Sequence, residues 1–239
     1  MLDFEEDYLI SLCMKYRDSF GELNQTMDEF GLTKEFGRGG RTLHRGFYCP
    51  SPVMDIIVGG CDRGRLVRKL RSNLSQDYVF LKEGDKLRIV DKYELDRNNI
   101  PYIHQREFII NNGAEVIAPK YDMGPIACFS ASHDLSFLSL CRYDASGRII
   151  KYLTIEPDFS LAGDKFFVNK KRSYLIGEQY SYNEETGLLD TVVNGDKLNA
   201  FISEYSYRFF HDETGRVVAY QDIERGTLRE IAKRKQRLV

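Results

Sequence analysis

The sequence predicts a mainly β protein of the α+β class. We expect one large, twisted antiparallel meander of about ten strands, curled or partly closed, with N-terminal helices packed on it. The main observation is that residues 141–152, 180–193 and 207–220 share one plan: an alternating aromatic run, a short polar turn that ends in glycine, and an apolar run. The second observation is composition, since fifteen Tyr and fifteen Phe favour strands.

The turn glycines show how these hairpins are arranged. They are Gly147, Gly187 and Gly215, separated by 40 and then 28 residues. Unequal spacing argues against a solenoid of fixed repeat length and favours neighbouring strands of one sheet. Two more turn signals, at 83–85 and at Asn112-Gly113, predict further hairpins. We interpret the alternating aromatic residues of 201–209 as sheet packing rather than as a stacking platform for sugars or bases.

The first third of the chain reads differently. Apolar residues recur at helical spacing over 3–20, and a second short helix is expected over 24–30. A loop rich in glycine and arginine follows, and then a basic helix is expected over 63–72. We therefore expect a helical and irregular portion at 1–76, the β-meander at 77–226 and a basic tail or short helix at 227–239. Together they are expected to form one structural domain.

No motif for catalysis, a metal or a cofactor is present. The sequence lacks a nucleotide-binding GxxxxGK[ST] loop, a GxSxG elbow and an HExxH pair. No two of the four histidines have metal-ligand spacing, and the five cysteines form no CxxC pair. We therefore predict no catalytic residue, no metal and no cofactor.

Two basic segments are the candidates for partner contact. The predicted contact residues are Arg38, Arg41, His44, Arg45, Arg65 and Arg68. The alternative is an enzyme, or a protein that binds an anion or nucleotide, because the Gly/Arg-rich loop 36–46 has the donors such a ligand needs. Cys49 beside this loop leaves a Cys–His nucleophile open. The segments 35–52 and 156–172 are both expected to be loops available to a partner.

Charge and chain start restrict the setting. A net charge of −2 makes nucleic acid an unexpected partner and gives no attraction to anionic membranes. The opening residues are acidic where a signal peptide is basic, and no apolar run reaches transmembrane length. We expect a cytoplasmic protein. The sequence does not indicate an oligomeric state.

The three hairpins resemble YD repeats, the tyrosine–aspartate units of bacterial Rhs-type proteins, whose pattern is roughly Tyr-x-Tyr-Asp-x-x-Gly-Arg-Leu. Residues 142–149 match this pattern, whereas the second hairpin has Asn183 for Asp and lacks the Arg. The third hairpin, with Gly215-Arg216-Val217, is a looser match. The matches cover under a quarter of the chain.

In overall layout the chain resembles the immunity proteins of bacterial polymorphic and contact-dependent toxin systems. Those proteins are typically of about this size, rich in strands, without a signal peptide and without an active site. The resemblance implies a cytoplasmic protein that neutralises a cognate toxin domain by direct binding. It implies affinity from a central aromatic or arginine cluster, with rim charges that speed association.

Overall fold

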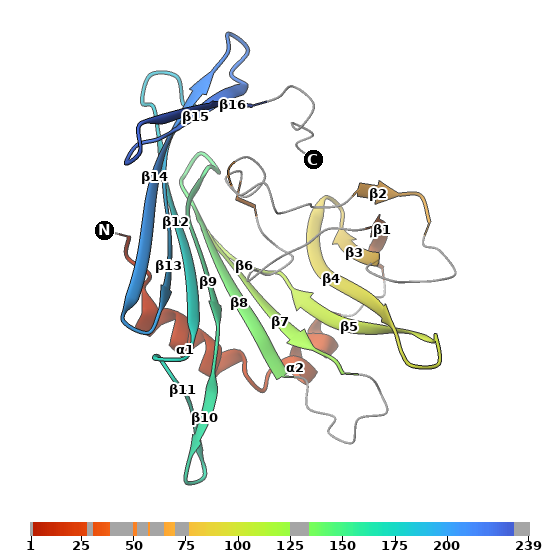
Figure 1. Cartoon of the computed structure of the whole chain (residues 1–239). Helices are drawn as coiled ribbons and strands as arrows, with labels where there is room; N and C mark the ends of the chain where they lie inside the picture. Colours follow the sequence, from red (N-terminus) through yellow and green to blue (C-terminus); the bar gives the residue numbers. More distant parts are fainter. Residues whose placement is uncertain are drawn as a thin grey trace.

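The computed structural model describes residues 2–27, 31–38, 50–51, 57, 65–69, 77–124 and 134–231 (Figure 1). Within these residues an antiparallel meander of fourteen strands dominates the fold. The predicted mainly β class, the meander and the N-terminal helices are confirmed, although the sheet has more strands than expected. The strands β2 and β16 form its two edges, so the sheet does not close.

The strands follow one another in space almost as they do in sequence. Their order is β16-β15-β14-β13-β12-β9-β8-β7-β5-β4-β3-β1-β2, with β6 paired to β7. The strands of this sheet are β1 (Thr33–Arg38), β2 (Arg65–Val67), β3 (Asp77–Glu83), β4 (Lys86–Leu95), β5 (Pro101–Phe108), β6 (Ile110–Asn112), β7 (Glu115–Asp122), β8 (Asp134–Tyr143), β9 (Ile149–Glu156), β12 (Tyr174–Tyr182), β13 (Leu189–Leu198), β14 (Phe201–His211), β15 (Val217–Asp222) and β16 (Thr227–Glu230). A separate two-stranded sheet consists of β10 (Phe159–Ala162) and β11 (Lys165–Val168).

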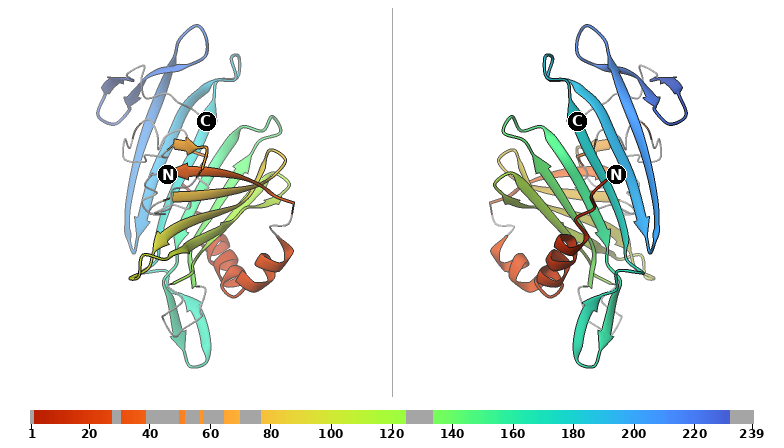
Figure 2. Two further views of the ribbon diagram at one scale, coloured as in Figure 1. Left: turned by 90° about the vertical axis from the view of Figure 1, so that its right-hand side faces the viewer. Right: turned by 90° about the vertical axis from the view of Figure 1, so that its left-hand side faces the viewer.

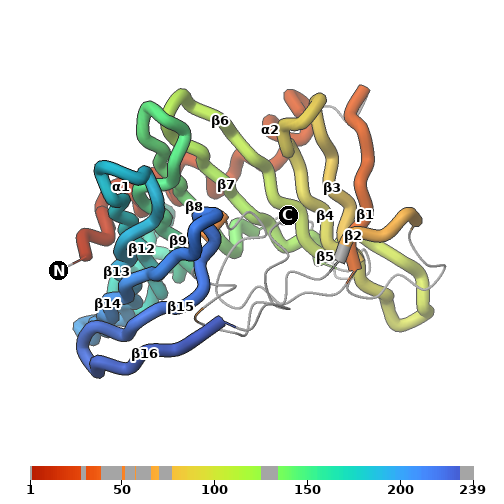
Figure 3. Tube along the Cα trace, turned by 90° about the horizontal axis from the view of Figure 1, so that it is seen from above, coloured from red at the N-terminus to blue at the C-terminus, as the bar shows by residue number. Residues whose placement is uncertain are grey.

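The sheet is strongly twisted and curved. In Figure 1 the strands β12 to β14 stand upright, whereas β5 lies across the view and β4 curves between the two directions. Seen from above in Figure 3, the sheet sweeps from β14 past β8 and β7 to β1. Right-handed strand twist accumulates over so many strands and separates the two edges.

Both helices lie on one side of the sheet, which we call the helix face (Figure 2). Helix α1 spans Glu6–Tyr16 and α2 spans Phe20–Thr26. The buried residues of α1 are Leu9, Leu12, Cys13 and Tyr16, which confirms the predicted apolar stripe. The second helix, expected over 24–30, is wrong in position, because it begins at Phe20 and ends at Thr26. The chain turns at Ser19, whose Oγ donates to the Lys15 carbonyl, and Gly21 lies inside α2.

Two apolar clusters cover the two faces of the sheet. On the helix face, α1 packs against large side chains of the central strands, among them Leu138, Leu153 and Ile155, all fully buried. On the opposite face, Tyr152 and Tyr180 lie in a second cluster of buried residues. Full burial of each such side chain contributes roughly 1.5–3 kcal/mol. These two hairpin tyrosines therefore pack on the sheet, as the sequence predicted.

The three similar hairpins share one turn device. Asp144 Oδ1 accepts hydrogen bonds from the backbone N–H groups of Ser146 and Arg148, both at 2.9 Å. In the third hairpin the carboxylate of Asp212 binds the backbone in the same way, and in the second Asn183 does so with a turn longer by one residue. The closing glycines all have positive φ, between 69° and 79°. Asp or Asn followed by Gly is the sequence requirement of this turn.

Candidate functional site

The predicted arginine cluster is only partly within the described residues. Arg38 lies on β1 directly opposite Arg65 on β2. Its Nε atom is 3.3 Å from Oδ1 of Asp77, a buried carboxylate on β3. Arg38 therefore has a structural partner in its own sheet. Arg68 follows β2 and is exposed.

The other predicted contacts cannot be placed. Arg41, His44 and Arg45 lie outside the described residues, as do Cys49 and the side chain of Arg65. Most of the loops 35–52 and 36–46 lies outside them too, apart from the part in β1. The alternative of an anion site on this loop stays a prediction.

The predicted basic helix over 63–72 is wrong at its centre. Residues 65–67 form β2, which pairs antiparallel with β1 and extends the sheet edge. A short strand at an open edge gains backbone hydrogen bonds that its own pattern does not reveal, so tertiary pairing overrides the helical spacing of Leu66 and Val67.

The segment 156–172 is a β-hairpin and not the loop that the sequence indicated. β10 and β11 pair in register, with Phe159 opposite Val168 and Leu161 opposite Phe166. The hairpin projects beyond the lower end of the sheet in Figure 1. Gly163, at φ 61°, closes its turn. The Ala-Gly-Asp turn between two apolar pairs was the signal for it.

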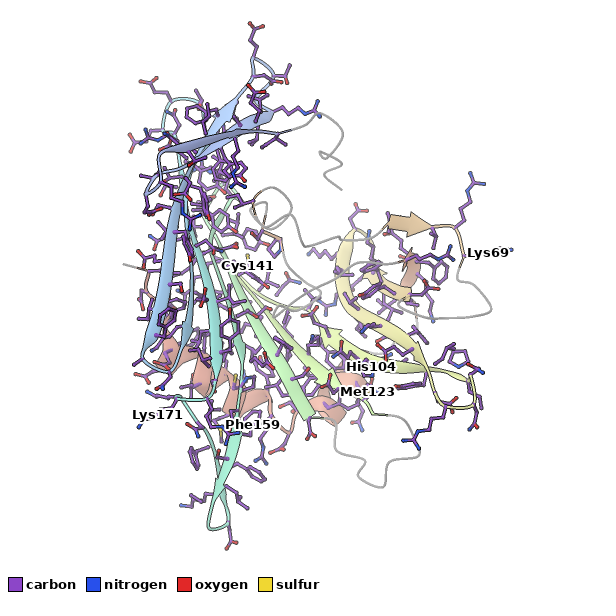
Figure 4. The ribbon with its side chains drawn as sticks, in the orientation of Figure 1. Lys69, His104, Met123, Cys141, Phe159 and Lys171 are labelled. Carbon is purple, nitrogen blue, oxygen red and sulfur yellow. The ribbon has the colours of Figure 1, made fainter. Side chains whose placement is uncertain are left out.

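The base of the hairpin is buried and its tip is exposed. Val168 belongs to the core beneath α1, and Phe159, labelled in Figure 4, packs against that core. Toward the tip, Leu161 is 60% exposed and Phe166 is 46% exposed. The Arg17 guanidinium lies 3.7 Å from the centroid of the Phe166 ring. The hairpin thus exposes Leu161 and Phe166 at its tip, while Phe159 and Val168 anchor its base to the core.

An open groove of about 440 Å³ lies where this hairpin leaves the sheet. Its walls come from the ends of three strands, β9, β12 and β13, and from the segments beside them: Glu156, Pro157, Asp158, Arg172, Tyr174 and Leu198. Tyr174 on β12 lies between Glu156 on β9 and Leu198 on β13 in the register of the sheet. Asp158 and Arg172 form an ion pair of 3.0 Å.

The β13–β14 turn borders the groove with more apolar surface. Leu198 pairs in register with Phe201, and Phe201 is 70% exposed. Ile202 is exposed as well. We call the β10–β11 hairpin, the groove and this turn the end surface. Sequence reasoning placed the aromatic face of β14 in packing; this holds for Phe209, which is buried, and not for Phe201.

Buried polar side chains lie on the face of the sheet opposite the helix face. Glu107 on β5 faces Lys120 on β7 in register, and both side chains are buried. Burial lowers the pKa of Lys120, and the negative charge of Glu107 opposes this. The Lys120 ammonium lies 4.0 Å from the centroid of the Phe137 ring. Lys120 is therefore held by a carboxylate and an aromatic face.

Farther along this face the polar groups also bind one another. Glu178 accepts hydrogen bonds from the Tyr180 hydroxyl and, at 3.0 Å, from Nδ2 of Asn194. The hydroxyls of Ser139 and Thr154 lie 3.0 Å apart. Satisfied buried networks of this kind fix strand register. The hydrogen bonds among these side chains account for their burial without a ligand.

The described residues offer few groups for redox or metal chemistry. Burial raises the pKa of the Cys13 thiol to about 12, so it is an inert apolar group at neutral pH. Among the described residues, no cluster of three or more His, Cys, Asp or Glu side chains is placed to hold a metal ion. Within the same part of the chain no helix has the length and apolar character needed to cross a membrane.

The end surface was only partly indicated by the sequence. Leu161 and Phe166 lie in the segment 156–172, which was expected to be available to a partner, whereas Leu198 and Phe201 were missed because they carry no motif and their exposure depends on how strand ends meet. No known protein family matches the chain, and no curated protein sequence matches it at a significant level. Its function therefore has to be inferred from the geometry of its surfaces.

Proposed function

We propose that this is a non-enzymatic binding protein, and specifically a cytoplasmic immunity protein that neutralises a cognate bacterial toxin domain by direct binding. The observation that carries the proposal is the end surface. There a groove with Leu198 in its wall lies between the base of the β10–β11 hairpin, whose tip exposes Leu161 and Phe166, and the β13–β14 turn, which exposes Phe201. The resemblance in layout to immunity proteins supports the toxin as the partner.

The end surface has the physical properties of a protein-binding site. Single exposed apolar side chains are normal on protein surfaces. Several of them gathered at one end of a molecule, beside a groove, indicate an interface. Phe201 and Phe166 are large anchors of the kind that dominate binding energy. The hairpin is tied to the core through Val168, so binding does not require this strand pair to fold first.

The arrangement supports binding better than catalysis. The ionisable groups that line the groove include the Asp158–Arg172 pair, which neutralises itself. Among the described residues that line the groove there is neither a His nor a Cys, so this part of the chain offers no Cys–His nucleophile there. The alternative anion site on loop 36–46 gains no support from Arg38, because that side chain pairs with Asp77.

The test is co-expression with the toxin domain that the neighbouring gene is expected to encode. The protein should restore growth to cells that produce the toxin, and the purified pair should bind with a Kd below micromolar in calorimetry. The proposal is wrong if the purified pair does not bind at micromolar concentration.

A further inference from the structure

Asp196, on β13, is a carboxylate with no cation beside it among the residues that the structure describes. It lies between Ile176 of β12 and Ser203 of β14 in the register of the sheet. Its side chain is half-buried, and burial raises its pKa. Among the residues that the structure describes, no side chain or backbone group forms an ion pair or a hydrogen bond with it.

Other half-buried carboxylates of this sheet have cations of their own. Glu5 binds both Lys151 and Arg142. Asp144 binds Arg148 through its side chain, at 2.8 Å. At these two positions the fold supplies a basic partner for the carboxylate. A partly desolvated carboxylate without one costs free energy, and a cation from outside recovers that cost.

Asp196 also lies beside the end surface. Asp196 and Leu198 are two positions apart on β13, so alternation along the strand puts them on the same face of the sheet. Leu198 lines the groove. On β14 the neighbours across the strand are Ser203 for Asp196 and Phe201 for Leu198. The free carboxylate is thus next to the exposed apolar residues.

The described residues that line the groove carry a slight excess of negative charge. Two are acidic, Glu156 and Asp158, and one is basic, Arg172, which pairs with Asp158 at 3.0 Å. Asp196 adds a further negative charge, two positions along β13 from Leu198. Such a surface attracts a basic partner and repels an acidic one.

We propose that the end surface binds a basic protein, with a Lys or Arg side chain of the partner paired to Asp196 and apolar side chains of the partner packed on Leu198 and Phe201. This rests on the proposed function and names the chemistry of the toxin surface that the protein covers. The contact combines a desolvated ion pair with an apolar rim, an arrangement that gives both affinity and choice of partner.

The test compares two isosteric variants on one strand. Asp196→Asn removes the charge beside the groove, and Asp190→Asn makes the same change six positions away near the other end of β13. The probe is the toxin domain from the neighbouring gene, titrated by calorimetry at low and at high salt. Asp196→Asn should raise Kd at least about tenfold and flatten its salt dependence. Asp190→Asn should change neither.

The outcomes separate the two proposals. If the unchanged protein neutralises and binds the toxin but Asp196→Asn leaves Kd and its salt dependence as they were, the basic-partner inference is wrong and the immunity function stands. If the unchanged protein does not bind the toxin at all, the immunity function is wrong and this inference falls with it.

Discussion

Gly177 on β12 and Gly195 on β13 lie directly opposite each other, and together they form a hollow in the helix face. Leu2 and Phe4 fill it: a Cβ atom on Gly177 would lie 2.7 Å from Cδ2 of Leu2. A Cβ atom on Gly195 would lie 2.8 Å from the backbone oxygen of Ser203. The two glycines therefore allow the N-terminal segment to dock on the sheet.

Gly195→Ala should destabilise the protein by about 1–3 kcal/mol, because a backbone oxygen cannot move aside as a flexible side chain can. Gly21→Ala is the matched control: its Cβ would meet nothing within 4 Å, and it lies inside α2. That variant should gain up to about 1 kcal/mol from helix propensity. Urea unfolding measures both, and equal effects would contradict the packing account.

A buried ion pair joins the second helix to the sheet. Arg106 on β5 donates two hydrogen bonds of 2.7 Å to the carboxylate of Asp91 on β4, and its Nη1 donates to Oδ1 of Asn24 on α2. Arg106→Met should cost about 3–5 kcal/mol, because it leaves Asp91 buried without its cation. Adding Asp91→Leu should recover part of that loss. A double variant as unstable as the sum of the single variants would show that the two residues act independently.

Stability should depend on Glu5 in a definite pH window. Burial alone would raise the pKa of Glu5, but hydrogen bonds and charges from Lys151 and Arg142 outweigh it and lower the pKa from 4.5. A lowered carboxyl pKa gives stability that is fully present above the unfolded value and is lost as pH falls through the folded one. Glu5→Gln should therefore lower Tm by a few degrees at pH 7. At pH values below the lowered folded pKa, where Glu5 is protonated in both states, the two melting curves should converge.

The sequence was enough to predict the meander because its signals are local. Asp144 with Gly147, and Asn112 with Gly113, specify turns within a few residues, and the α1 stripe specifies one buried face. Edge strand β2 was missed because it forms through pairing with β1, and the sequence of β2 alone does not indicate that pairing. The hairpin of β10 and β11 was missed because its four-residue strands are too short to show alternation.

The candidate site was less predictable for a related reason. The arginines stood out by composition, yet Arg38 is used within the sheet. Phe201 and Asp196 did not stand out, since alternation along a strand says which residues share a face and not whether that face is covered. Exposure of Phe201 is decided by where β13 and β14 end relative to their neighbours. That is a property of the whole sheet.

The hairpin tip should matter for binding and little for folding. Leu161→Ser with Phe166→Ser should weaken toxin binding by at least about tenfold, because both side chains are exposed apolar anchors. Leu228→Ser is the matched control, a 58% exposed leucine on β16 at the opposite end of the molecule in Figure 1. It should bind as the unchanged protein does. Similar Tm values for all variants would exclude misfolding, and normal binding by the hairpin variant would remove the tip from the interface.

Asp196 should show opposite effects on stability and on binding. Because burial raises its pKa, the folded state disfavours the ionised carboxylate relative to the unfolded chain. A raised carboxyl pKa therefore costs stability above the folded pKa, and the cost disappears as pH falls below the unfolded value. Asp196→Asn should raise Tm at pH 7 and leave it unchanged near pH 3, while the same variant binds the toxin more weakly. Thermal melts at both pH values check this. A lower Tm at pH 7 would mean that Asp196 is retained for folding, whereas a higher one means that the fold keeps a costly charge for its partner.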